Sequence, residues 1–138
     1  MINNKFYKHF FVLFFLTMVL GCSKPDAVQL IDKAIEAEHR TPSYTQRDKY
    51  RHPKETLLFF GLNPEQSIVE ITPGYGWYAE ILAPLIRNKG QYYYTSLKLH
   101  EKINPYFVKV EKAFKEKMEK NPDIYDQLRW VHFDPKQP

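Results

Sequence analysis

The stretch that decides the fold is residues 68–78, Ile-Val-Glu-Ile-Thr-Pro-Gly-Tyr-Gly-Trp-Tyr. A short apolar run carries one acid, Glu70, and passes into a turn that holds Gly74 and Gly76; residues 79–86 continue with a helix-like apolar pattern. A strand, a glycine turn and a helix in succession are typical of open α/β sheets. There the glycines let the backbone approach a ligand and the helix start offers unpaired N–H groups. The stretch therefore predicts a ligand-binding turn at the end of a strand.

The first 21 residues have the pattern of an export signal. Lys5 and Lys8 precede an apolar run over residues 10–20, which at 11 residues is shorter than the roughly 20 that span a bilayer as a helix. Val19-Leu20-Gly21-Cys22 follow and resemble a bacterial lipobox. The resemblance implies cleavage before Cys22, lipid attachment there, and a membrane-anchored protein facing the periplasm. Ser23, in place of an acid, favours the outer membrane over the inner. The alternative is a buried N-terminal helix with an incidental cysteine.

The charge balance argues against a nucleic-acid partner. The chain has 20 Lys and Arg against 16 Asp and Glu, and the signal accounts for two of the lysines, which leaves 18 against 16. A nucleic-acid-binding domain would show a clustered basic face, whereas the lysines of residues 109–120 are interleaved with glutamates. No spacing typical of a metal site joins the four histidines beyond the signal, so we predict no metal. These are His39, His52, His100 and His132.

Residues 22–39 are expected to form a lipidated tether and a first helix, and residues 40–138 one small domain. Helices are predicted over residues 28–38, 53–60 and 77–87, another opening at Asn104, and a short one over 122–128. Pro84 predicts a kink or an early end of its helix. Strands are predicted over residues 67–72, 91–97 and 129–133, and a loop over 39–51. The alternation of strands and helices predicts an α/β fold, the N-terminal half of a Rossmann-like three-layer sandwich with about three parallel strands.

A family resemblance rests on two segments. The pattern Glu70-x-Thr72-x-Gly74-x-Gly76 is similar to the acidic, glycine-containing loop of class I S-adenosylmethionine-dependent methyltransferases. Together, residues 50–62 (Tyr-Arg-His-Pro-Lys-Glu-Thr-Leu-Leu-Phe-Phe-Gly-Leu) and residues 69–84 resemble a group of bacterial predicted methyltransferases that are often exported. The resemblance covers about residues 40–135 and implies S-adenosylmethionine as the cofactor.

The resemblance also implies roles for individual residues. Gly74 and Gly76 would let the loop pass close to the methionine part of the cofactor, Glu70 would contact its amino group, and Asp134 would lie near its adenine. Alternatively, Glu70 only orders the loop and the glycines only serve a tight turn. The implied cofactor-contacting residues are Glu70, Thr72, Pro73, Gly74, Tyr75, Gly76, Ser96, Glu101 and Asp134.

Two features depart from the family pattern. Thr72 stands where the loop usually has its first glycine, and the second strand ends without the acid that usually holds the ribose, which leaves Ser96 or Glu101 for that role. The family fold has about seven strands, whereas three are predicted here. A truncated gene, one half of a split pair, and a small domain that forms a homodimer each explain this, and we favour truncation.

Two functional hypotheses follow. The first is an S-adenosylmethionine-dependent methyltransferase, inactive if truncated, for which no catalytic residue can be named because methyl transfer needs mainly positioning. The second is a membrane-anchored, non-catalytic lipoprotein that binds a small ligand or a partner protein.

Overall fold

The computed structural model describes residues 26–95 and 104–131, and its centre is a small parallel sheet. Strands β1 (Ser67–Ile71), β2 (Gln91–Thr95) and β3 (Arg129–Trp130) lie in the order β1-β2-β3. Ser67 pairs with Gln91 at the start of the β1–β2 ladder. The three predicted parallel strands are confirmed within the described residues, and the arrangement is compatible with part of a Rossmann-like fold.

Seven helices accompany this sheet in the described part of the chain. The helices predicted over residues 28–38, 53–60 and 77–87 are confirmed, with ends shifted by at most three residues. The loop predicted over residues 39–51 is wrong, because two single-turn helices form there, each beginning beside a residue that suits a helix start, Pro42 and Asp48. The helices are α2 (Ala27–Ile35), α3 (Pro42–Thr45), α4 (Asp48–Arg51), α5 (Pro53–Phe59), α6 (Ala79–Ile86), α7 (Pro105–Lys120) and α8 (Pro122–Tyr125).

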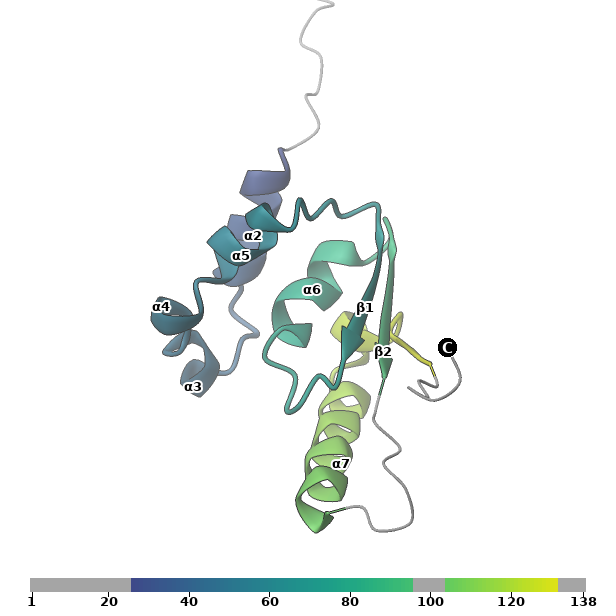
Figure 1. Cartoon of the computed structure of the whole chain (residues 1–138). Coiled ribbons are helices and arrows are strands. Elements are labelled where there is room, and N and C mark those ends of the chain that lie inside the picture. Colours follow the sequence, from purple (N-terminus) through teal and green to yellow (C-terminus); the bar gives the residue numbers. More distant parts are fainter. Residues whose placement is uncertain (1–25, 96–103, 132–138) are drawn as a thin grey trace, which may run out of the picture.

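The helices lie on one side of the sheet (Figure 1). Tyr92 and Tyr94 of β2 are buried beneath them. Val69 and Ile71, which alternate to the opposite face of β1, remain 56% and 55% exposed. The described residues therefore form two of the three layers predicted, because both crossovers of a sheet that grows in one direction place their helices on the same face.

Helix α6 forms the centre of the core and continues past its proline. Its residues Ile81 and Ile86 are almost completely buried. Pro84 has no N–H to donate to the carbonyl of Glu80, four residues earlier. The His39 Nε2 atom lies 2.8 Å from that carbonyl oxygen and supplies the missing donor. Of the kink or early end predicted at Pro84, the early end is wrong, since the helix extends to Ile86.

Helix α7 begins as the sequence predicts. The Asn104 side chain accepts a hydrogen bond from the backbone N–H of Tyr106 at 2.9 Å, and Pro105 occupies the first helical position. Val110 and Phe114 form its buried face. None of the helices in residues 26–95 and 104–131 has the length and apolar character needed to cross a membrane.

Candidate functional site

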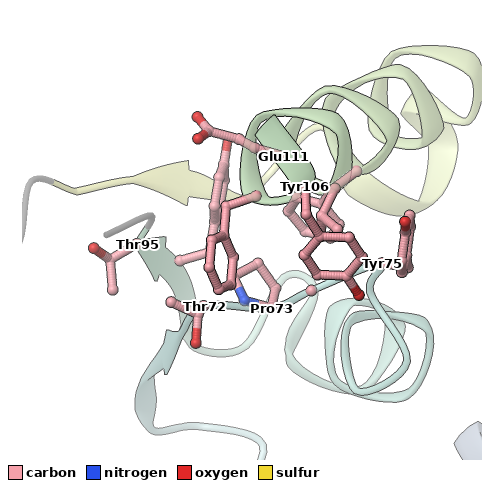
Figure 2. A pocket seen from close by; sticks show the side chains of 11 residues that line it. Thr72, Pro73, Tyr75, Thr95, Tyr106 and Glu111 are labelled. Atoms are coloured by element: carbon pink, nitrogen blue, oxygen red, sulfur yellow. The ribbon is translucent and has the colours of Figure 1, made fainter. Parts of the chain in front are cut away.

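A pocket of about 230 Å³ opens at the carboxyl ends of β1 and β2, between the loop after β1 and the first half of α7 (Figure 2). Figure 2 shows that the lining side chains come from the loop, which carries Thr72, Pro73 and Tyr75, and from α7, which carries Tyr106 and Glu111. In open α/β sheets, ligands bind at this edge. The lining residues are Thr72, Pro73, Gly74, Tyr75, Tyr94, Thr95, Tyr106, Phe107, Val110, Glu111 and Phe114.

Thr72 lies in the left-handed region of backbone conformation that favours glycine. Its φ is +54°, a value that a β-branched residue rarely adopts. Its backbone N–H donates to the carbonyl of Thr95 at 3.0 Å and so continues the β1–β2 pairing by one residue. The loop therefore makes a left-handed turn at Thr72, and does so under backbone strain.

The two glycines of the loop have different surroundings. Gly74, at φ +59°, lines the pocket, and a Cβ added there would meet nothing within 4 Å. Gly76, at φ +85°, lies against the ring of Phe114, which a Cβ would approach to 2.8 Å. Gly76 thus provides room for a core ring of this same chain. Gly74 is the glycine whose open side faces the pocket.

Glu70 lies away from the pocket. The Tyr92 hydroxyl donates a hydrogen bond to its carboxylate, and Glu70 is absent from the pocket lining. Burial raises the pKa of Glu70, and the hydrogen bond from Tyr92 and the positive charge of Arg51 oppose that rise. Burial together with the Glu70 charge raises the pKa of the Tyr92 hydroxyl well above its usual range. Tyr92 is therefore the residue that Glu70 engages in this structure.

A buried acid that the sequence analysis did not select holds the loop in place. Glu80 is 1% exposed, and its carboxylate accepts hydrogen bonds from the Thr41 N–H at 3.0 Å, the Thr41 hydroxyl at 2.6 Å and the Lys117 ammonium at 2.6 Å. The Tyr44 hydroxyl donates to the carbonyl of Tyr75 at 3.0 Å, and Lys117 lies 3.3 Å from the same oxygen. An acid in the otherwise apolar helix over residues 79–86 was the available signal for this role.

The two segments that carry the family resemblance contact each other. The Arg51 guanidinium lies 4.3 Å from the centre of the Trp77 ring, and the Trp77 indole N–H donates to the Tyr44 carbonyl at 3.0 Å. Arg40, buried beneath the same ring, pairs with Asp48 through both of its terminal nitrogens. Arg51 and Trp77, one from each segment, therefore have a structural role in this structure.

The pocket is mainly apolar and has one carboxylate among its described lining residues. Phe114 is fully buried at its base and packs edge-to-face on Tyr94 at 5.2 Å. The carboxylate belongs to Glu111, which forms an ion pair with Lys115 at 2.7 Å, and this hydrogen bond is the main cause of a raised Lys115 pKa. Aromatic rings with a few hydroxyls suit a flat, partly apolar ligand.

Four residues predicted to have a function lie outside the described ranges: the cofactor-contact candidates Ser96, Glu101 and Asp134, and the lipidation candidate Cys22. Among the other candidates, Thr72, Pro73, Gly74 and Tyr75 line the pocket, whereas Glu70 and Gly76 do not. Within residues 26–95 and 104–131, no three His, Cys, Asp or Glu side chains come together as a metal site would require.

No family model, curated protein or solved structure matches this chain. The methyltransferase resemblance accordingly rests on the motif residues themselves.

Proposed function

We propose that this chain is the cofactor-binding half of a class I methyltransferase fold and that it binds S-adenosylmethionine at the pocket beside Gly74. The observation that carries the proposal is the location of the pocket. It lies at the carboxyl ends of two parallel strands and against the turn that contains Gly74, where open α/β sheets bind nucleotide-like ligands.

The shape and chemistry of the pocket support an adenosyl compound. Its volume, about 230 Å³, is below the roughly 300–1,000 Å³ of pockets that enclose a drug-sized ligand, so the described residues would enclose part of the cofactor. Rings of Tyr75 and Tyr106 border it, and aromatic faces attract both a purine and a positive sulfonium. Ser96, Glu101 and Asp134 remain the proposed contacts to the ribose and adenine.

Calorimetric titration of the chain with S-adenosylmethionine tests the proposal, with a matched pair of variants. Gly74 and Gly61 have nearly the same φ, +59° and +63°, and each has open space around the missing Cβ, but Gly61 lies outside the pocket. Gly74→Val and Gly61→Val should therefore strain the backbone equally. We expect loss of binding only in Gly74→Val. Equal affinities of the two variants, or no binding by the folded parent, would refute the proposed site.

A second candidate is non-catalytic binding of another small aromatic compound. The observation that favours it is the contact of Glu70 with Tyr92 rather than with the pocket, which leaves the cofactor's amino group without its expected carboxylate. Titration with adenosine separates the two candidates, because adenosine lacks the methionine part of the cofactor and therefore the α-amino group that Glu70 was expected to contact. Equal affinity for adenosine and S-adenosylmethionine would favour this second function.

The exposed face and edge of β1 favour a further partner. Val69 and Ile71 are more than half exposed, whereas parallel sheets are usually covered on both faces. We propose that a second copy or a separate C-terminal half covers them. Sedimentation of the parent and of Val69→Lys tests this, since the lysine should abolish any assembly that uses this face.

We also propose that Cys22 carries lipid and anchors the chain to a membrane facing the periplasm, the outer membrane in preference to the inner. The support is the lipobox-like sequence before Cys22. Intact-mass measurement of the chain expressed with its first 21 residues tests this, with Cys22→Ser as the control. An unmodified mass in the parent would refute it.

A further inference from the structure

Two adjacent aromatic rings are exposed at the end of α5. Phe59 and Phe60 are 85% and 74% exposed, and their rings contact each other edge-to-face at 5.5 Å. Leu58 beside them is 38% exposed. Single exposed apolar residues are normal, but three in succession, two of them with large rings, form a patch of the kind that marks an interaction surface.

The patch lies beside a hollow that is lined by the start of α2 and the end of α5. Asp26 and Val28, at the start of α2, line it together with Leu58 of α5 and Leu62, which follows the end of α5. Figure 1 shows the same proximity of the two helix ends. The aromatic pair therefore lies at the end of the domain where the chain arrives from Cys22. Asp26 follows Cys22 by four positions, with three residues between them, and such a segment spans at most about 14 Å when fully extended.

We propose that Phe59 and Phe60 insert into the surface of the phospholipid bilayer that holds the Cys22 lipid. The inference rests on the proposed lipidation, because the short tether keeps this end of the domain near the bilayer. Phenylalanine is among the apolar residues that peripheral segments bury at the boundary between headgroups and acyl chains, and a second membrane contact beside a lipid anchor restricts how the domain is oriented.

The charges near the patch indicate an apolar rather than an electrostatic attachment. Glu55 precedes Phe59 by one helical turn and is exposed, while Lys89 lines the hollow with Glu65. Lys54 is already paired with Asp32 at 2.7 Å. Acids and bases are mixed here, so contact should form on zwitterionic phosphatidylcholine and change little with salt.

This orientation has a consequence for the candidate pocket. The carboxyl ends of β1 and β2 point away from the end where α2 begins (Figure 1). With Phe59 and Phe60 in the bilayer, the pocket would open away from the membrane surface, toward soluble ligands.

Tryptophan quenching in the full lipidated chain tests the inference. Phe59→Trp places a probe in the patch, and Tyr106→Trp places one at the start of α7, where the native tyrosine is 57% exposed. Both substitutions exchange one exposed aromatic ring for another, so folding should be preserved, and both retain Trp77 and Trp130. The proteins are reconstituted in phosphatidylcholine vesicles whose acyl chains carry bromine, which quenches tryptophan on contact.

We expect the fluorescence added by Phe59→Trp to be quenched at least twofold more than that added by Tyr106→Trp, at low and at high salt. Equal quenching of the two probes would overturn the inference, even if the protein stays on the vesicles through its lipid. A lipid-free dimer that Phe59→Ser dissociates, without preferential quenching, would also overturn it and assign the patch to a second copy. Intact mass reports lipidation independently, so a missing anchor is distinguishable from a patch that does not touch lipid.

Discussion

The role of the hydrogen bond between His39 and α6 can be tested by restoring the helical N–H that Pro84 lacks. Pro84 leaves the Glu80 carbonyl without a helical donor, and the His39 Nε2 atom, 2.8 Å away, takes that place. Replacing His39 by alanine should therefore leave a buried acceptor unpaired. Replacing Pro84 by alanine restores the N–H that the helix lacks, and the same loss of His39 should then matter much less.

The magnitude follows from the burial of Glu80, which is 1% exposed. An unsatisfied buried acceptor costs about 1–3 kcal/mol, so His39→Ala should destabilise the parent by that amount. In the Pro84→Ala background only the packing of the imidazole is lost. We expect a coupling energy of about 1–2 kcal/mol, within the range for residues that share a hydrogen bond.

Urea unfolding of the four proteins of this cycle at one pH measures the coupling energy. For a domain of this size, 1 kcal/mol corresponds to roughly 4–8 °C in Tm, so thermal unfolding provides an independent readout. If the two substitutions add to within about 0.3–0.5 kcal/mol, His39 does not satisfy the Glu80 carbonyl and the explanation for the intact helix is wrong.

Three further predictions concern the loop and the strand before it. Gly76→Ala should cost about 2–5 kcal/mol, from backbone strain and a 2.8 Å approach to the buried Phe114 ring; a cost below 1 kcal/mol in urea unfolding would contradict that packing. Thr72→Gly should raise the unfolding free energy by up to about 1 kcal/mol, because release of a φ of +54° outweighs the extra freedom of glycine in the unfolded chain. Burial raises the pKa of Glu70 above its ordinary 4.5. The folded state therefore holds the Glu70 proton more tightly than the unfolded state does. The free energy of unfolding falls as the pH rises from the ordinary pKa of Glu70 through its raised pKa in the folded state. Glu70→Gln should consequently gain stability over the parent at neutral pH and lose that gain at acidic pH, and a pH-independent difference would be contradictory.

Periodicity and turn residues were sufficient to predict the strands and the long helices. The aromatic and β-branched content of residues 91–97 predicted β2, and Asn104-Pro105 predicted the start of α7, because caps and strand composition are local properties. The segment over residues 39–51 was missed because its helices are single turns, too short for any periodicity. Their stability comes instead from long-range contacts, such as the hydrogen bond of the Thr41 hydroxyl to Glu80 and that of the Trp77 indole to the Tyr44 carbonyl.

The candidate site was predicted in part for the same reason. The turn at Gly74 is a local feature and was placed correctly at the end of β1. The contacts of Glu70 with Tyr92 and of Gly76 with Phe114 are different in kind. They join residues that come together only once the sheet and α7 have folded. One sequence cannot show those neighbours, so it could not separate a ligand-binding glycine from one that accommodates a core ring.

The contacts around Glu80 determine how the loop can respond to a ligand. Thr41 and Lys117, from segments far apart in the chain, converge on one buried carboxylate, and Lys117 and Tyr44 both reach the Tyr75 carbonyl of the loop. The loop is thus held from two sides by residues outside the pocket lining. A ligand that enters the pocket meets a backbone already ordered by the fold, and binding avoids the entropic cost of ordering it. Loss of the Lys117 ammonium, for example in Lys117→Met, should therefore weaken ligand binding although Lys117 lies outside the pocket.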